Sequence, residues 1–180
     1  YYQWGDVQGY DKWDDKYFYW YDDFGNVSYK WCNGSQTSMI KYNTKSSYGK
    51  VDNKTTLDLD DDAASVVLGG NWRMPTNEEW EELANTSNCS WTWAEIDGIK
   101  GYKVQSKKSG YTTKWIFLPA NGAFSGDDLQ SRGQTGSYWS SSLNTVSPDK
   151  AHDVSFDSFG NLNVDDNYRF WGQATRPVSE

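Results

Sequence analysis

The sequence predicts a single α+β domain in which two helices precede a run of antiparallel strands. Helix signals are confined to residues 55–85, whereas residues 90–178 alternate short β-favouring runs with turn residues. Because helices and strands do not alternate as βαβ units, this order favours segregated elements over a parallel sheet. The 180 residues suit one domain, 1–180. Residues 1–55 are expected to form long ordered loops with a strand or two.

The two helices are predicted from the signals at their ends. In TTLDLDDDAASVVLGG, residues 55–70, Asp60 can cap a helix, acids fill its first turn, and Gly69 stops it. In MPTNEEWEELANTS, residues 74–87, Thr76 and Glu79 have the spacing of a capping box. The helix that follows is expected to turn Trp80, Leu83 and Ala84 inward.

The strands are predicted from β-favouring runs separated by turn residues. Turns are expected at Asp97-Gly98, Ser109-Gly110 and Phe159-Gly160. The predicted strands are WTWAEI (91–96), IKGYKVQS (99–106), TTKWIFLPA (112–120), GSYWSSS (136–142), AHDVSFDS (151–158), GNLNV (160–164) and QATRPV (173–178). Alternation along them favours inward positions for Trp139, Val154 and Phe156.

Composition and charge disfavour several classes of partner. Aromatic residues make up 17% of the chain, with 11 Trp and 13 Tyr, which argues against disorder. A net charge of −8 disfavours nucleic acid or an anionic membrane as a partner, because both are themselves negative. No apolar run approaches the roughly 20 residues of a membrane helix, so we expect no membrane insertion by this segment.

The acids of residues 58–62 and the two cysteines are the candidate metal ligands of the chain. Asp58-x-Asp60-x-Asp62 opens like an EF-hand loop, but Ala63 stands where glycine is needed and Gly69 where glutamate is needed. Acids at a helix N-terminus are the favoured interpretation, with an irregular calcium site as the alternative and no other cofactor expected. Cys32 and Cys89 could form a disulfide or remain buried thiols, and without a Cys/His cluster a zinc site is not expected.

Catalysis is not indicated by the polar residues. His152 is the sole histidine, and Ser140 to Ser142 lack the G-x-S-x-G setting of a nucleophile, so His152 is expected to be a surface residue on a strand. Lysines cluster around a predicted hairpin, at Lys103, Lys107, Lys108 and Lys114. A solvated strand end is the favoured interpretation, and a phosphate or nucleic-acid patch is the alternative.

The segment 137–178 mixes polar and aromatic residues without a regular period. Tyr168, Phe170 and Trp171 stand beside Asp165, Asp166 and Asn167. Rings with small polar groups are typical of antibody-type binding surfaces. Sugars also suit such a mixture, since their C–H faces stack on rings while acids and amides hold their hydroxyls. The composition therefore favours an exposed binding face here.

Several motifs together resemble a known family. GGNWRMPTNEEWEEL (69–83), YWSSS (138–142) and GQATRPV (172–178), with YKWCNGS and VDNKTTLDLDDDAA, resemble FISUMP-type domains. That family belongs to the C-type-lectin-like superfamily, in the branch of the formylglycine-generating enzymes, and is similar to the variable proteins of diversity-generating retroelements. The resemblance implies a C-type-lectin-like fold and a secreted or cell-surface bacterial protein. The family's strand region before YYQWGD is absent, so the N-terminal part of the domain is expected to be missing.

The resemblance also implies residue roles. The scaffold positions would be Trp139, Arg169, Gly172 and Arg176, and 137–178 would be the variable ligand-binding segment. The ligand-facing positions would be Tyr138, Asn144, His152, Asp153, Ser155, Asp157, Asp165, Asp166, Asn167, Tyr168, Phe170 and Trp171. The enzymes of this branch use a cysteine pair in the C-terminal part, and no cysteine follows Cys89 here. No catalytic residue is therefore assigned.

These expectations combine into one functional hypothesis. The chain would be a non-catalytic adhesin or receptor-recognition protein that is diversified by a retroelement. It would bind a protein or glycan on another cell or host through its C-terminal strands and loops, with Tyr168, Phe170 and Trp171 as anchors. The alternatives are a structural subunit of a pilus or surface assembly, and a phage receptor-binding protein.

Overall fold

Strands and loops dominate the fold, and its few helices are short. The computed structural model describes residues 1–11 and 13–179. Over these residues the α-helices are α1 (Ala63–Leu68) and α2 (Asn77–Ala84), with 3-10 turns at Ser46–Tyr48 and Leu59–Asp61. The strands are β1 (Trp72–Arg73), β2 (Cys89–Ile96), β3 (Ile99–Ser106), β4 (Trp115–Pro119), β5 (Ala123–Ser125), β6 (Asp128–Gln130), β7 (Thr135–Leu143), β8 (Lys150–Asp157), β9 (Leu162–Tyr168) and β10 (Val178–Ser179). The predicted loop-rich α+β class is confirmed.

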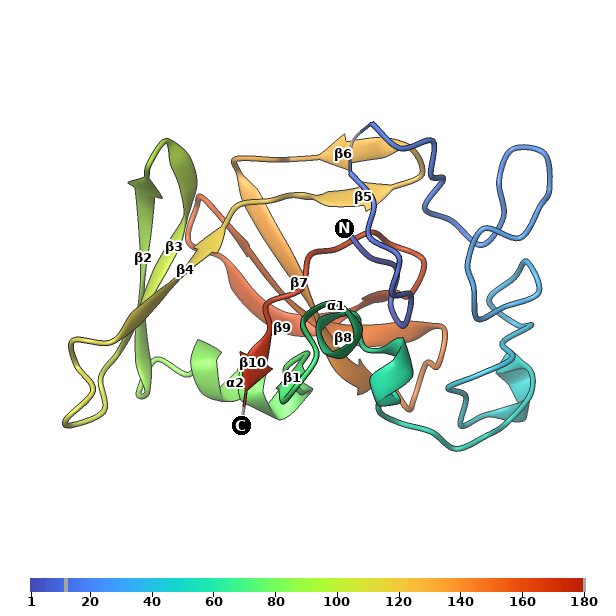
Figure 1. Cartoon of the computed structure of the whole chain (residues 1–180), viewed down its shortest axis with the longest axis horizontal. Coiled ribbons are helices and arrows are strands. Elements are labelled where there is room, and N and C mark those ends of the chain that lie inside the picture. Colours follow the sequence, from blue (N-terminus) through green and yellow to red (C-terminus); the bar gives the residue numbers. More distant parts are fainter. Residues whose placement is uncertain (12, 180) are drawn as a thin grey trace.

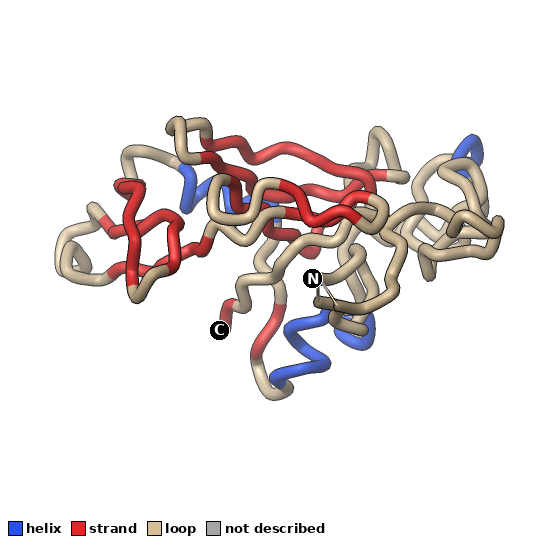
Figure 2. Tube along the Cα trace, turned by 90° about the horizontal axis from the view of Figure 1, so that it is seen from above, coloured by secondary structure: helices blue, strands red, loops and turns tan. Residues whose placement is uncertain are grey.

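The strands form four small antiparallel sheets. Two have three strands, in the orders β2-β3-β4 and β7-β8-β9, and two pair β5 with β6 and β1 with β10. In Figure 1 the β2-β3-β4 sheet lies at one end, β7-β8-β9 in the middle, and the N-terminal loops at the other end. Figure 2 shows the same division from above. The turns predicted at Asp97-Gly98 and Phe159-Gly160 connect β2 to β3 and β8 to β9.

The first helix begins later than its sequence predicts. Asp62, not Asp60, is the N-cap, and its carboxylate accepts hydrogen bonds from the backbone N–H groups of Ala64 and Ser65. Its other oxygen accepts from the N–H of Met74 at 2.8 Å. The buried carboxylate thus serves two segments, which Asp60 on the exposed 3-10 turn cannot do. The end of the helix at Gly69 is confirmed.

The second helix follows its prediction closely. Thr76 accepts from the N–H of Glu79, and the Glu79 carboxylate accepts from the N–H of Thr76, so the capping box is formed. Arg73 adds a two-pronged ion pair to Glu79 at 2.7 and 2.8 Å. Trp80 is buried, whereas Leu83 and Ala84 are partly buried. Charge-assisted pairs with such geometry fix the helix against β1.

The central strand β7 is buried on both faces. Trp139 joins a cluster with Trp4, Tyr42 and the residues around α1, and Tyr138 joins a second cluster on the opposite face. Val154 and Phe156 of β8 lie in this second cluster, as their alternation predicts. Large rings thus supply the core of a chain that is poor in aliphatic residues.

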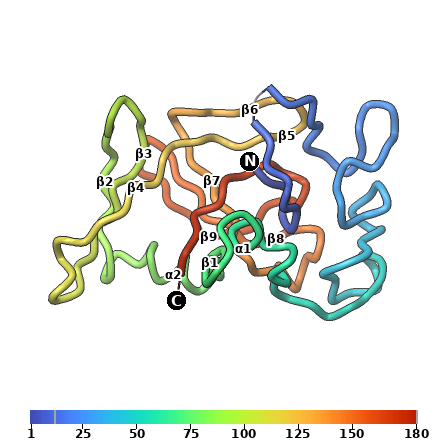
Figure 3. Tube along the Cα trace, viewed as in Figure 1, coloured from blue at the N-terminus to red at the C-terminus, as the bar shows by residue number. Residues whose placement is uncertain are grey.

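Residues 1–55 form ordered loops and not a sheet, and backbone hydrogen bonds connect these loops to the C-terminal segment. In their described part the backbone makes isolated bridges, such as Tyr2 with Gln173. Figure 3 shows this segment starting in the middle of the molecule and then running, from blue to teal, along the side away from β2, β3 and β4. Gly172 lies where it must be glycine, because an added Cβ would come within 2.4 Å of the Phe18 ring. The N-terminal loops are therefore part of one folded unit.

Two remaining expectations concern cysteines and membranes. Cys32 and Cys89 are both free thiols in separate clusters, so the disulfide alternative is not realised. Cys32 is buried, whereas Cys89 is only partly buried. Among the described helices none has the length and apolar character that crossing a bilayer requires.

Candidate ligand-binding surface

Strand alternation divides the predicted ligand-facing residues between the two faces of the β7-β8-β9 sheet. Across β8 and β9, Lys150 pairs with Tyr168 and His152 with Asp166 on one face. Asp153 pairs with Asp165 on the opposite face. Successive side chains on a strand point to opposite sides, so residues adjacent in sequence cannot share one surface. The predicted set therefore does not form one site.

Three of the predicted residues are buried, and their assignment as ligand-facing is wrong for this structure. Tyr138 is 3% exposed, and its hydroxyl donates to the backbone oxygen of Pro119 at 2.7 Å. Asp153 is 1% exposed and Phe170 is 4% exposed. Tyr138 lies on a strand that is covered on both faces, and Phe170 lies under the N-terminal loops. Alternation along a strand does not indicate whether other segments of the chain cover its second face.

Three further residues have structural contacts. The Asp157 carboxylate accepts from the N–H groups of Phe159 and Asn161, which closes the β8–β9 turn. The Asn167 amide donates to Asp153 at 3.1 Å. Trp171 is partly buried and packs against two core clusters. Its expected role as an exposed anchor is not supported by this packing.

Four predicted residues lie together on the α2 side of the sheet, and a fifth residue joins them. The Asn144 amide donates to Asp166 Oδ2 at 2.7 Å, and Lys150 Nζ lies 2.6 Å from Asp166 Oδ1. The hydrogen bond that Lys150 donates to the Asp166 carboxylate raises the pKa of Lys150. The same ammonium lies 5.4 Å from the Tyr168 ring centroid. Lys150 was not among the predicted residues, although its place two residues before His152 puts it on the same face.

A polar hollow adjoins these residues at the start of α2. It encloses about 340 Å³ and is lined by His152, Asn77 and Glu78. The rest of its lining comes from Leu143 and from residues with hydroxyl groups, which are Thr55, Thr56, Thr76, Ser142 and Thr145. Asn77 Oδ1 is buried without a hydrogen-bond partner among the described protein atoms, while its amide nitrogen donates to Glu81. A buried carbonyl oxygen of this kind accepts a donor from a bound molecule or from water.

Aromatic rings continue the surface beyond Tyr168. Tyr168 is 38% exposed and stacks on Phe170, which contacts Tyr19 at a ring-centroid distance of 4.7 Å. Tyr19 in turn meets Tyr21 edge to face at 5.4 Å. The sequence signal for these rings is the alternation in residues 17–21, where Phe18 and Trp20 point inward and the tyrosines outward.

We name these residues the recognition surface: Tyr19, Tyr21, Asn144, Lys150, His152, Asp166 and Tyr168. Ser155 and Asp165 lie on the opposite face of the sheet, and Asp165 is exposed there. His152 is half-buried, and its Nδ1 lies 3.2 Å from the backbone oxygen of Asp165. The surface combines hydrogen-bonding groups of both charges, from the sheet and the loop after β7, with exposed rings from β9 and the N-terminal loops.

Metal-ligating residues do not gather in the described part of the chain, where no three His, Cys, Asp or Glu side chains are close enough to share an ion. Within the Asp58-x-Asp60-x-Asp62 stretch, Asp58 pairs with Lys41 at 2.7 Å and also with Lys54. These contacts lower the pKa of Asp58 to about 2. Asp62 caps α1, which confirms the interpretation of this acid as a helix N-terminal group.

Asp153 provides a pH-dependent test of the buried face. Burial is the main cause that raises its pKa to about 6, against hydrogen bonds from Asn167 and Gln173 that favour the carboxylate. The folded state therefore binds a proton at Asp153 more tightly than the unfolded state does. The ionised Asp153 carboxylate destabilises the fold above about pH 6, and this destabilisation is lost as the pH falls to about 4 and below. Asp153→Asn should raise the free energy of unfolding by about 1–3 kcal/mol at pH 7.

Urea unfolding of both proteins at pH 7 and at pH 4 measures this difference. At pH 4 the gain should shrink to a small fraction of its value at pH 7, because the carboxyl of Asp153 is then protonated in the folded state and roughly half protonated in the unfolded state. The new amide could also donate to Gln173 Oε1, a buried oxygen without a partner among the described protein atoms. Equal gains at both pH values would contradict the electrostatic cause.

No family model, curated protein or solved structure matches this chain. The loop-rich α+β architecture therefore stands on the structure itself. The C-type-lectin-like fold and the kinship with FISUMP-type domains stay predictions from the motifs.

Proposed function

We propose that this chain is a non-catalytic ligand-binding domain with a C-type-lectin-like fold, secreted or displayed at a bacterial cell surface. It would act in adhesion or receptor recognition, by binding a protein or a glycan on another cell or host. The observation that carries this proposal is the recognition surface, where four residues expected to face a ligand share one face with Lys150 and two tyrosines.

The chemistry of this surface suits a polar ligand with apolar faces. Tyr19, Tyr21 and Tyr168 offer exposed rings. Tyr19 and Tyr168 are held in place by the buried rings of Phe170 and Trp20, and Tyr21 packs edge to face on Tyr19. Rigid rings supply contact area at a low cost in conformational entropy. Asp166 and Lys150 present a charged pair at the sheet edge, and the adjoining hollow offers hydroxyl groups. Each of these groups can bind without changing a covalent bond, so the proposal needs no catalytic residue.

The role of the surface can be tested by comparing its two faces. An array of immobilised glycans and extracellular proteins would be probed with the wild type, with the double variant Tyr168→Ala/His152→Ala, and with Asp165→Ala as a control. The double variant should lose about 2 kcal/mol or more of binding free energy, roughly a thirtyfold loss of affinity. Asp165 is exposed on the other face, so its replacement should change little. Equal binding by all three proteins would sink the proposal.

A structural subunit of a pilus or surface assembly is a second candidate. Large apolar side chains are exposed in the N-terminal loops, with Phe24 at 91% and Trp13 at 79%. Exposed rings of this kind are covered when subunits pack together. Light scattering of the purified protein separates the two functions, since the subunit should self-associate and the adhesin should remain monomeric. A phage receptor-binding protein would use the recognition surface in the same way as an adhesin.

A further inference from the structure

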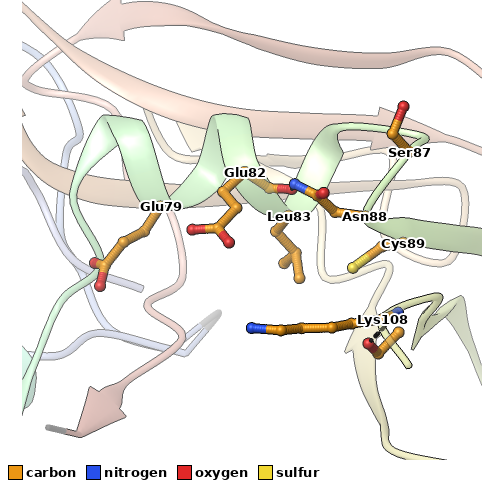
Figure 4. Close-up of a pocket in the computed structure, with 8 residues that line it drawn as sticks. Glu79, Glu82, Leu83, Ser87, Asn88, Cys89 and Lys108 are labelled. Carbon is orange, nitrogen blue, oxygen red and sulfur yellow. Dashed lines mark hydrogen bonds between the residues drawn. The ribbon is translucent and has the colours of Figure 1, made fainter. Parts of the chain in front are cut away.

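A groove separates α2 from the β2-β3-β4 sheet, on the side of the molecule away from the N-terminal loops. Its larger part encloses about 510 Å³ and is lined by Glu82, Leu83, Cys89 and Lys108, among others. Figure 4 shows Lys108 extending across this opening, with the acids of α2 on the opposite side. A smaller, mostly apolar part of about 180 Å³ shares Leu83 and Cys89 with it. None of these residues belongs to the recognition surface.

The two walls of the groove carry opposite charges. On the positive wall the Lys108 ammonium lies 5.7 Å from the Tyr111 ring centroid, a contact that leaves its charge unpaired. The Glu79 carboxylate is already engaged by Arg73. Glu82 and Lys108 are exposed, and neither has an ion-pair partner among the residues that the structure describes. A negative wall facing a positive wall favours a ligand that presents a positive and a negative group in turn.

The floor between these walls is apolar. Leu83 and Cys89 lie where the two parts meet, and Val104, Trp115 and Ile116 line the smaller part. Sites of this composition, an apolar floor with a few polar groups, are typical of ligand-binding clefts. An apolar side chain placed here would leave water and gain roughly 1.5–3 kcal/mol if fully buried.

Hydrogen bonds fix the two walls relative to each other. Trp91 Nε1 donates to the backbone oxygen of Leu83 at 2.9 Å, which ties the end of α2 to β2. The N–H of Lys107 donates to the oxygen of Asn88 at 2.7 Å, and Lys107 Nζ donates to that of Thr86. The groove is therefore formed before any ligand arrives, which lowers the entropy cost of binding.

We propose that this groove binds a short peptide segment in which an apolar side chain stands between a basic and an acidic residue. The basic residue would pair with Glu82, the acidic residue with Lys108, and the apolar side chain would enter the floor beside Leu83. The groove would be a second binding site of the domain, independent of the recognition surface.

Selection from a displayed library of random heptapeptides tests the charge pattern. The wild type should enrich peptides that carry one basic and one acidic residue around an apolar one. Glu82→Lys should enrich peptides with two acidic residues, and Lys108→Glu peptides with two basic residues, because each variant gives both walls the same charge. Tyr168→Ala, which alters only the recognition surface, should enrich the wild-type pattern. The same peptides from all four proteins, or no enrichment at all, would overturn the proposal.

The rate at which the Cys89 thiol reacts measures directly whether a peptide occupies the groove. Cys32 is buried, so a maleimide should label Cys89 alone in the folded protein. Burial and the nearby Glu82 raise the pKa of Cys89, so labelling is followed in mildly alkaline buffer. A saturating heptapeptide from the wild-type selection should slow labelling at least about threefold, and the same peptide with its apolar residue changed to serine should not. An unchanged rate with the selected peptide would place it elsewhere and refute the site.

Discussion

Replacing Arg169 by alanine is expected to remove a large part of the free energy that keeps the chain folded. Arg169 is fully buried, and its guanidinium donates to the Tyr29 hydroxyl and the Pro148 carbonyl, both at 2.8 Å. It also donates to the carbonyls of Tyr42 and Lys41 and lies 4.9 Å from the Trp4 ring centroid. One side chain thus joins the N-terminal loops to the end of β9.

The cost of losing these bonds is large because the acceptors stay buried. A hydrogen bond to a charged group contributes about 1.5–3 kcal/mol, and an abandoned buried acceptor adds its own desolvation penalty. Alanine would also leave a cavity beside the rings of Trp4 and Tyr29. We expect a loss of at least about 4 kcal/mol, against a total stability of about 5–15 kcal/mol for domains in general.

Urea unfolding followed by tryptophan fluorescence measures this loss. Arg176→Ala is the matched control, because Arg176 lies in the same C-terminal segment and is only partly buried. The control should lose about 1 kcal/mol or less. Similar losses in the two variants would mean that charge in this segment, and not the buried hydrogen bonds of Arg169, supports the fold.

Local sequence signals predicted the elements whose structure depends on near neighbours. The capping box of Thr76 and Glu79 and the turn at Asp97-Gly98 rely on residues a few positions apart, and both are formed. The cap of α1 was misplaced because Asp62 is selected by the distant N–H of Met74 as well as by its own helix. That second partner is 12 residues away and leaves no local pattern.

The candidate site was harder to predict because burial is a property of the whole fold. Tyr138 and Phe170 resemble exposed ring residues in sequence, yet the N-terminal loops and neighbouring strands cover them. Alternation along β8 and β9 was available from the sequence and separates Asp165 from Asp166. Alternation does not indicate which face of the sheet stays exposed to solvent. Tyr19 and Tyr21 entered the surface only because the fold brings residues 17–21 against the end of β9.

Replacing Phe170 by alanine should destabilise the domain far more than the same change at Tyr168, although the two rings stack on each other. Phe170 is 4% exposed and also packs against Trp20 and Tyr19, each at a ring-centroid distance of 4.7 Å. Truncating a buried ring costs about 3–5 kcal/mol, which lowers Tm by roughly 6–20 °C in a domain of this size.

Tyr168→Ala is both the comparison and the control, since Tyr168 is 38% exposed and its removal leaves Phe170 under Trp20. It should lower Tm by only a few degrees, which corresponds to about 1 kcal/mol. Thermal melts of the two variants then distinguish the ring of Phe170, which belongs to the core, from the ring of Tyr168, which faces outward. Equal melting temperatures would mean that the N-terminal loops do not cover Phe170 in solution, and the recognition surface would then have to include it.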